Sequence, residues 1–271
     1  MRTATFIRHA QSAANAGEVT EDVSQIGLTP CGRVEALKIA SSFSEPPTLI
    51  VVSPYLRTRL TAQPTIYRVP DVPVEEWPVQ EFTYLEPSRW NGTSPAERRP
   101  VVAEWWAKAG PGYRAGTGSE SFSDLLRRAR NTLERLERLP ERNRVFVFTH
   151  GQFMQALRLL LIFPRDTDKA QMARFRDFDR EHPIENSALF SIGMDRWTPW
   201  QFMYRSSGAR PMRTHEEMAD RSEESMLENM ERKLAWGEGQ LNRLSLEEQN
   251  RLAEKYALLR EEELHYPTWR L

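Results

Sequence analysis

Two short runs of β-branched and aromatic residues each lead into a histidine, and this pair of runs constrains the fold more than any other feature of the sequence. The first run covers residues 3–8 and is followed by His9, and the second covers residues 145–148 and leads to His150. Such runs are typical of buried strands. Ligands of open α/β sheets bind beyond the carboxyl ends of the strands, so we expect the two histidines at one site.

Strand and helix patterns alternate along the chain up to about residue 162. A third apolar run covers residues 49–52, and two further strands are expected over residues 188–192 and 201–204. Helical patterns lie between the runs, over residues 30–41, 57–66, 118–139 and 153–162. This alternation predicts an α/β layered sheet, and right-handed crossovers leave few topologies for it.

Local signals fix several helix starts. Thr29 is expected to cap a helix that has Pro30 at its first position, with Val34, Leu37 and Ala40 on its apolar face. A later helix is expected to start at a serine cap, Ser119 or Ser121, with Asp124 completing a capping box. The proline-rich stretch over residues 67–90 predicts a loop or a short edge strand.

Composition excludes several classes of function. The net charge is −1, which gives no general attraction to nucleic acids or anionic membranes. Cys31 is the only cysteine, so neither an intrachain disulfide nor a cysteine-based metal site is expected. The sequence shows no signal-peptide pattern and no apolar run as long as a membrane span. We therefore expect a cytoplasmic protein without membrane or nucleic-acid partners.

The residues at the expected strand ends fit the chemistry of a phosphate monoester. A phosphate dianion is bound by arginine forks and backbone N–H groups, and a neutral imidazole can attack phosphorus. Arg8 and Arg57 are candidate forks, His9 is the candidate nucleophile, and Asn15 could donate an amide N–H. His150 precedes Gly151, which opens a helix, and a helix N-terminus favours an anion.

The segment Arg8-His9-Ala10-Gln11-Ser12-Ala13-Ala14-Asn15 resembles the Arg-His-Gly-x-Ser-x-x-Asn signature of the histidine phosphatase (phosphoglycerate mutase-like) superfamily. Further segments are similar to motifs of that family and occur in the same order, at residues 28–32, 53–58, 118–122, 149–151 and 185–188. The resemblance covers roughly residues 3–205. It implies a three-layer α/β sandwich with a mostly parallel central sheet flanked by helices.

The resemblance also implies roles for individual residues. His9 would become phosphohistidine, while Arg8, Asn15, Arg57 and His150 would bind the phosphoryl group. The family's proton donor is a carboxylic acid between the second strand and the long helix, and Glu81 fits that place best, with Glu86 as the alternative. No metal and no cofactor are implied. The expected partner is a small phosphorylated substrate or a phosphoprotein.

Two departures from the family pattern bear on these expectations. Ala10 stands where most members have glycine, and alanine fits there only if its φ stays negative. The Arg-His-Tyr-Gly-like segment of cofactor-dependent phosphoglycerate mutases is absent around Glu81. A metal-independent phosphatase is therefore favoured over a mutase that transfers phosphate between hydroxyls. A non-catalytic phosphate-binding or scaffold protein stays open as a third alternative.

The composition changes after Gly208. Residues 1–208 are expected to form the catalytic domain, and residues 209–271 a helical C-terminal extension. The apolar faces of the extension have two interpretations, packing back on the domain or forming an arm for a homodimer. Partial disorder at the very end is a third.

Overall fold

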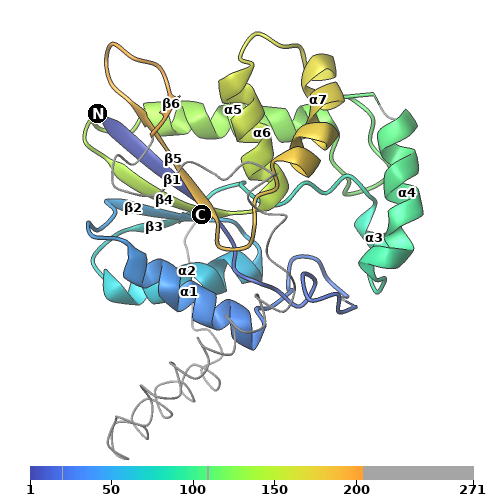
Figure 1. The fold of residues 1–271 in the computed structure, drawn as a ribbon, viewed down its shortest axis with the longest axis horizontal. Helices are drawn as coiled ribbons and strands as arrows, with labels where there is room; N and C mark the ends of the chain where they lie inside the picture. The colour runs from blue at the N-terminus through green and yellow to red at the C-terminus, as the bar shows by residue number, and fades with distance from the viewer. Residues whose placement is uncertain (20, 109, 204–271) are drawn as a thin grey trace, which may run out of the picture. The chain divides into compact units, whose positions relative to one another are not determined.

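The computed structural model describes residues 1–19, 21–108 and 110–203, which form an α/β sandwich of three layers (Figure 1). The central sheet has six strands in the order β3-β2-β4-β1-β5-β6. The first four of these pair in parallel, while β5 and β6 join by antiparallel pairing. The strands are β1 (Arg2–Arg8), β2 (Leu49–Val52), β3 (Val74–Glu76), β4 (Arg144–Thr149), β5 (Leu189–Met194) and β6 (Gln201–Phe202). The expected mostly parallel sheet is confirmed.

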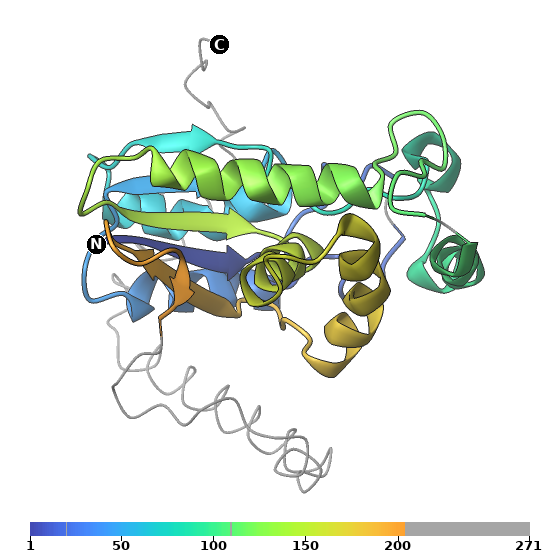
Figure 2. The ribbon, with the colours of Figure 1, turned by 90° about the horizontal axis from the view of Figure 1, so that it is seen from above.

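Helices cover both faces of the sheet, as the view from above makes clear (Figure 2). Helices α1 and α2 lie on one face and α5 and α6 on the other, with α3 and α4 beyond one end (Figure 1). The helices are α1 (Pro30–Ser42), α2 (Leu56–Arg68), α3 (Pro87–Trp90), α4 (Pro95–Lys108), α5 (Phe122–Glu137), α6 (Gly151–Ile162) and α7 (Asp168–Glu181).

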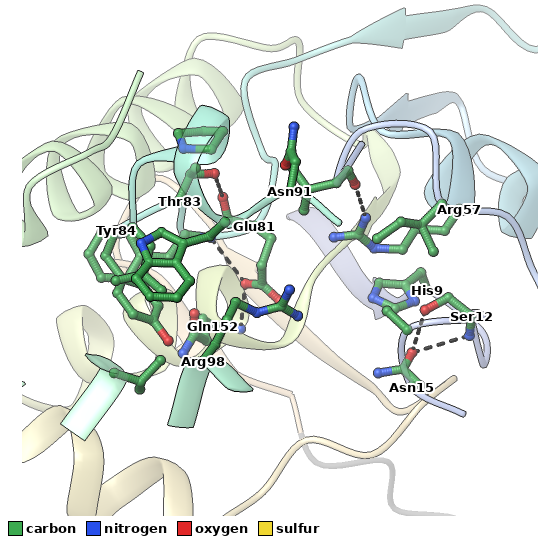
Figure 3. A pocket seen from close by; sticks show the side chains of 18 of the residues that line it. His9, Ser12, Asn15, Arg57, Glu81, Thr83, Tyr84, Asn91, Arg98 and Gln152 are labelled. Atoms are coloured by element: carbon green, nitrogen blue, oxygen red, sulfur yellow. Dashed lines mark hydrogen bonds between the residues drawn. The ribbon is translucent and has the colours of Figure 1, made fainter. Parts of the chain in front are cut away.

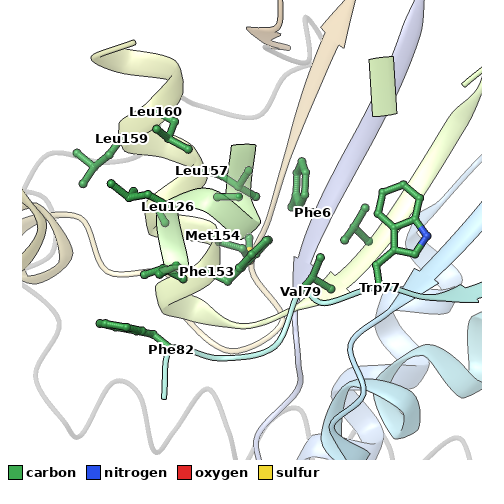
Figure 4. Packing of buried hydrophobic residues seen from close by; sticks show 14 of the residues in the cluster. Phe6, Trp77, Val79, Phe82, Leu126, Phe153, Met154, Leu157, Leu159 and Leu160 are labelled. Atoms are coloured by element: carbon green, nitrogen blue, oxygen red, sulfur yellow. The ribbon is translucent and has the colours of Figure 1, made fainter. Parts of the chain in front are cut away.

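The alternation of side chains along each strand produces two separate cores. Phe6, Val51 and Val147 point into the larger core, which packs against α5 and α6 (Figure 4). Their neighbours Ile7 and Phe148 belong to the smaller core on the opposite face of the sheet. Because both faces are covered, the strands read as continuous apolar runs, which is the pattern that identified them in the sequence.

The predicted helix starts are confirmed at two places. The Thr29 hydroxyl accepts a hydrogen bond from Gly32 N at 3.0 Å, with Pro30 as the first residue of α1. Ser121 caps α5, and Asp124 completes the capping box by accepting from Ser121 N at 3.0 Å. Each cap satisfies backbone N–H groups that have no partner within the helix.

The apolar face predicted for α1 is wrong at two positions. Val34 is 51% exposed and Leu37 is 39% exposed, whereas Ala40 is buried as predicted. The buried side of α1 consists of Gly32, Ala36, Ile39 and Ala40. Three of these four residues are small, and at Gly32 the backbone of Gln11 leaves no room for a Cβ.

Three helices were not predicted. Helix α3 lies within residues 67–90, which were expected to form a loop or a short edge strand. Helix α4 lies beyond that stretch, and α7 follows Pro164. Proline is compatible with the first turn of a helix, where its missing N–H has no partner to lose, and Pro87 and Pro95 stand at helix starts. The expected edge strand within this region is β3.

The predicted extension over residues 209–271, the dimer interface assigned to it and Tyr204 of the last strand lie outside the described residues. These predictions are therefore untested. Across the residues that are described, no helix combines the length and the apolar character needed to cross a membrane.

The packing of α1 leads to a stability prediction. A Cβ on Gly32 would lie 2.0 Å from the carbonyl oxygen of Gln11, which is backbone and cannot rotate away. We expect Gly32→Ala to lower the free energy of unfolding by about 1–3 kcal/mol, in the range of an overpacked core. Gly27→Ala is the matched control, because nothing lies within 4 Å of its Cβ position. Equal urea midpoints for the two variants would contradict this account.

Candidate active site

The site begins at the parallel pairing of β1 with β4. Arg8 is in register with Thr149, and His9 N donates to the Thr149 carbonyl at 2.9 Å. This pairing brings the residue after each strand to the same edge of the sheet. The rings of His9 and His150 consequently lie edge to face, with their centroids 5.1 Å apart.

One hydrogen bond fixes the tautomer of His9. Its Nδ1 lies 2.8 Å from the carbonyl oxygen of Ala10, which can only accept, so Nδ1 carries the proton and Nε2 keeps its lone pair. Ala10 is held in turn by Thr61, whose Oγ1 accepts from Ala10 N at 3.0 Å. Ala10 does not have a positive φ, so alanine is accommodated where most family members have glycine.

Burial and nearby cations keep His9 neutral. Its side chain is buried, and burial together with the guanidiniums of Arg57 and Arg8 lowers its pKa well below the ordinary value. The hydrogen bond to Ala10 opposes this shift without overcoming it. The free imidazole is therefore present at neutral and mildly acidic pH, which is the form a nucleophile needs.

Arg57 and Arg8 reach the site from different elements. Arg57 is the second residue of α2, and its Nη1 donates to the Val23 carbonyl at 2.7 Å. Burial lowers the Arg57 pKa to about 10, so the group stays cationic at neutral pH. Arg8 donates through Nη1 to the Ile184 carbonyl, and its buried Nε has no hydrogen-bond partner in the described part of the chain.

The carboxylate of Glu81 lies beside the first turn of α6, where it accepts hydrogen bonds from backbone N–H groups. Oε1 accepts from Gln152 N at 3.0 Å and from Phe82 N at 3.2 Å, leaving Oε2 for other contacts. Burial raises the pKa of Glu81, while Arg57, Arg8 and the two N–H groups oppose the increase. A raised pKa is what a general acid needs near neutral pH.

An ion pair inside the protein holds the segment that carries Glu81. Arg128 on α5 binds Glu120 with two hydrogen bonds, of 2.6 Å from Nε and 2.7 Å from Nη2. Its Nη1 also donates to the carbonyls of Pro78 and Gln80, at 2.8 and 3.1 Å. The guanidinium thereby connects the long helix to the backbone immediately before Glu81.

His150 lies behind the other site residues. It is fully buried, its Nε2 is 2.8 Å from Ser53 Oγ, and its Nδ1 has no hydrogen-bond partner among the residues described. Burial and the charge of Arg57 lower its pKa well below the ordinary value. Gly151 follows it, and a Cβ there would lie 3.4 Å from Arg8 Nε, so the glycine leaves room for that arginine.

A cavity of about 270 Å³ opens at this edge of the sheet (Figure 3). Five of the predicted site residues line it, namely Arg8, His9, Asn15, Arg57 and Glu81. His150, Gly151 and the alternative acid Glu86 do not. Glu86 precedes α3 and contacts Gly116 and Ser88 instead. Glu81, and not Glu86, thus lines the same cavity as His9, whereas the His150 ring contacts the His9 ring without lining that cavity.

Apart from Arg98, which the sequence offers as an extension of the pocket toward a second phosphate, sequence reasoning missed several residues of the site. Gln152 lines the cavity beside Glu81, and Tyr84 and Arg98 lie on the same side of it, across from His9 (Figure 3). Asn186 bridges the His9 carbonyl, at 3.1 Å, and Asn15 Oδ1, at 3.0 Å. The position of Gln152, next after the glycine that opens a helix, was a usable signal. Tyr84 lies in the stretch expected to be a loop or a short edge strand, and Asn186 lies in the motif over residues 185–188, to which no role at the site was assigned.

No cluster of three or more histidine, cysteine, aspartate or glutamate side chains able to hold a metal ion occurs within the described residues. The positive charge at the site comes from arginines. Among the described residues, the carboxylate and imidazole groups at the site belong to Glu81, His9 and His150, and His150 is fully buried.

The sequence and the fold are both similar to those of known proteins. Residues 4–176 match the family model described as the histidine phosphatase superfamily, branch 1. A sequence search of curated proteins gave no significant match.

Three solved structures illustrate the similarity in fold. Mycobacterial glucosyl-3-phosphoglycerate phosphatase complexed with VO3 has a TM-score of 0.57 at 22% identity, over 75% of this chain and 98% of the other. Phosphoserine phosphatase from Entamoeba histolytica has a TM-score of 0.58 at 19% identity, over 75% and 96% of the two chains. The α-ribazole phosphatase from Shigella flexneri has a TM-score of 0.59 at 16% identity, over 77% and 100%.

The Arg128 fork yields a prediction about stability. We expect Arg128→Gln to lower the free energy of unfolding by about 2–4 kcal/mol, because the largely buried carboxylate of Glu120 loses its partner. Arg138→Gln at the C-cap of the same helix is the control, since its pair with Glu134 is mostly exposed and should contribute less than about 1 kcal/mol. Urea denaturation of both variants measures the difference, and equal losses would contradict a special role for the fork.

Proposed function

The chain belongs to the histidine phosphatase superfamily, branch 1, and from this we propose that it is a metal-independent phosphatase that hydrolyses phosphate monoesters through a phosphohistidine on His9. One observation carries the proposal. A neutral imidazole with a free Nε2 and a carboxyl group of raised pKa line the same cavity as two arginines. These are the nucleophile, acid and anion ligands that the reaction needs.

In the first step, the lone pair of His9 Nε2 attacks phosphorus and the bond from phosphorus to the ester oxygen breaks. Glu81 gives its proton to the departing oxygen, which leaves as an alcohol. Arg8, Arg57 and Asn15 bind the remaining phosphoryl oxygens, and positive charge placed there stabilises the transition state. His150 is assigned to the same site as a neutral imidazole that packs against His9.

In the second step, water attacks the phosphohistidine and the bond from phosphorus to nitrogen breaks. The Glu81 carboxylate, now without its proton, accepts one from the water. Inorganic phosphate leaves, and both His9 and Glu81 return to their starting forms. The two backbone N–H groups on Oε1 keep Oε2 directed to one place throughout.

The two alternatives make different use of the same residues. A mutase would return the phosphoryl group to a second hydroxyl of its substrate, so 3-phosphoglycerate with 2,3-bisphosphoglycerate would give 2-phosphoglycerate rather than free phosphate. A phosphate-binding scaffold would bind vanadate or phosphate without turnover. Neither alternative has a particular feature of the cavity in its favour.

Substitution of the nucleophile tests the proposal most directly. We expect the wild type to hydrolyse p-nitrophenyl phosphate in the presence of EDTA, and His9→Ala to lose essentially all of that activity. Quenching the wild type during turnover with denaturant at alkaline pH, where the acid-labile phosphorus–nitrogen bond survives, should also give a protein heavier by one phosphoryl group, which is absent from the variant. Equal rates in the two proteins, or inhibition by EDTA, would overturn the proposal.

The pKa shifts predict the shape of the pH profile. His9 must be neutral, so kcat/KM is lost on the acid side only below its lowered pKa. Glu81 must be protonated, so kcat/KM declines as the pH rises through its raised pKa. The expected profile is a bell with its maximum at mildly acidic pH.

Removing the acid separates its role from that of the alternative carboxylate. With an alkyl phosphate, whose leaving group is poor, Glu81→Gln should lower kcat about 10²- to 10⁴-fold and abolish the alkaline limb of the profile. Glu86→Gln is the control and should keep both limbs. A Glu81→Gln enzyme whose alkaline limb is unchanged would assign the acid to another residue.

A further inference from the structure

The proposed acid Glu81 lies on a stretch of backbone, residues 77–86 between β3 and α3, that is neither helix nor strand. Glu81 therefore takes no part in a regular ladder of backbone hydrogen bonds, and side-chain contacts with the stretch set where it lies. Before Glu81, the Thr149 hydroxyl donates to the Val79 carbonyl at 2.5 Å, and Arg128 donates to the carbonyls on either side of it. The contacts after Glu81 come from a different part of the chain.

Thr83 holds the stretch on that side. Its hydroxyl oxygen lies 3.1 Å from the hydroxyl oxygen of Tyr55, and it donates to the Glu81 carbonyl at 3.4 Å. A threonine hydroxyl has one proton to give, and here the Glu81 carbonyl accepts it, so Tyr55 is the donor in the other bond. A chain of hydrogen bonds therefore runs from the Tyr55 phenol through Thr83 to the peptide group of the acid itself.

The ring of Tyr55 contacts groups on the phosphoryl side of the site. The Cζ of Arg57 lies 4.8 Å from the centre of the ring, which is within the range of a cation–π contact. The ring of His150 meets it edge to face, with the centroids 5.2 Å apart. Tyr55 consequently contacts a proposed ligand of the phosphoryl group through its ring and the segment of the acid through its hydroxyl.

Tyr55 makes these contacts without reaching the substrate. It does not line the cavity at His9, whereas Arg57 and Thr83 do (Figure 3). Burial raises the pKa of its phenol, although the bond to Thr83 and the charge of Arg57 oppose the shift. The phenol therefore keeps its proton, and stays a hydrogen-bond donor, from acid to mildly alkaline pH. Any effect of Tyr55 on the reaction has to pass through the residues that it contacts.

The separation of Arg57 from Glu81 matters to the proposed reaction. Arg57 is assigned to the phosphoryl oxygens, and Glu81 has to give a proton to the ester oxygen on the same phosphorus. A proton donor must come within about 2.6–3.2 Å of the atom that receives the proton, and small displacements cost large factors in rate. Within the described residues no ion pair joins the two groups directly, so a residue that contacts both sides sets their separation.

We propose that Tyr55 is a positioning residue for the phosphatase reaction, which sets the separation between the guanidinium of Arg57 and the carboxyl group of Glu81. Its ring holds the guanidinium, and its hydroxyl holds the segment of the acid through Thr83. The inference rests on the proposed phosphatase function and adds to it a residue outside the cavity on which the reaction depends. Because the two contacts use different parts of one side chain, they can be removed separately.

Two substrates that need the acid to different extents test the hydroxyl. An alkyl phosphate has a poor leaving group and depends on the proton of Glu81, whereas p-nitrophenyl phosphate releases a stable phenolate and depends on it little. We expect Tyr55→Phe to lower kcat/KM about tenfold or more with the alkyl phosphate and less than about twofold with p-nitrophenyl phosphate. The ratio of the two values within one enzyme does not depend on how much active protein a variant yields. The alkaline limb of the pH profile should remain, because Glu81 is still present.

A double-mutant cycle tests whether the hydroxyl acts through Thr83. Thr83→Val keeps the shape of the side chain but removes both the acceptor for Tyr55 and the donor to Glu81. The ratio of alkyl to p-nitrophenyl kcat/KM should therefore fall at least as far as in Tyr55→Phe. The double variant should be no worse than Thr83→Val alone, because both substitutions break the same chain of hydrogen bonds.

The affinity for inorganic phosphate, which binds the arginines but has no leaving group, tests the ring. Tyr55→Phe keeps the ring, so the inhibition constant of phosphate should stay at the wild-type value. Tyr55→Leu removes the ring as well and should raise that constant about two- to fivefold, as expected for the loss of one cation–π contact. An unchanged constant in Tyr55→Leu would overturn the part of the proposal that concerns Arg57.

Tyr67→Phe is the matched control for loss of a tyrosine hydroxyl. Tyr67 lies on α2, its hydroxyl accepts a hydrogen bond from Gln63, and it lines neither the cavity at His9 nor the hollow beside it that α4 and α7 line. This variant should keep the wild-type ratio of alkyl to p-nitrophenyl kcat/KM.

The possible failures are distinguishable. If Tyr55→Phe keeps the wild-type ratio, if its loss simply adds to that of Thr83→Val, or if Tyr67→Phe changes the ratio as much, the positioning role is overturned while the phosphatase function stands. Loss of the alkaline limb in Tyr55→Phe would make the phenol itself the acid and would also overturn the proposal. If the wild type hydrolyses neither substrate, the phosphatase function fails and the inference fails with it.

Discussion

The chemistry depends on one backbone contact, the parallel pairing of β1 with β4. The hydrogen bond from His9 N to the Thr149 carbonyl ends that ladder and sets the two histidine rings against each other. A shift of one residue in this register would move every strand side chain to the opposite face of the sheet. The two hydrophobic cores, with Phe6 in one and Ile7 in the other, therefore specify the catalytic geometry as well as the stability of the fold.

Burial shifts the two proposed reacting groups in opposite senses, and this is useful to the reaction. Removing water penalises the charged form of each group, so the imidazole of His9 loses its proton more readily and the carboxyl of Glu81 keeps its own. Arg57 and Arg8 strengthen the first effect and weaken the second. The site can thus hold a free nucleophile beside a protonated acid only because desolvation outweighs the arginines at Glu81.

The sequence was informative where local chemistry determines structure. Continuous apolar runs identified the buried strands, and the residues that follow them, His9 and Arg57, were correctly placed at one edge of the sheet. The sequence was misleading where contacts between distant parts of the chain determine which side chains are buried. Val34 and Leu37 looked like a core-facing stripe, yet the buried side of α1 is the one that carries Gly32, where the backbone of Gln11 leaves no room for a Cβ. The burial of His150 behind the cavity likewise depends on Ser53, a partner 97 positions away.

Two of the unpredicted helices, α4 and α7, line hollows at the site but carry none of the residues proposed to react. Strand ends position His9, while α4 and α7 carry Arg98 and Arg176 on separate chain segments. Glu81 is held by helices on the face of the sheet. Gln152 N, at the start of α6, donates to its carboxylate, and Arg128 connects its segment to α5. Substitutions on α4 and α7 can therefore change the lining of these hollows while the backbone contact that holds the Glu81 carboxylate stays in place.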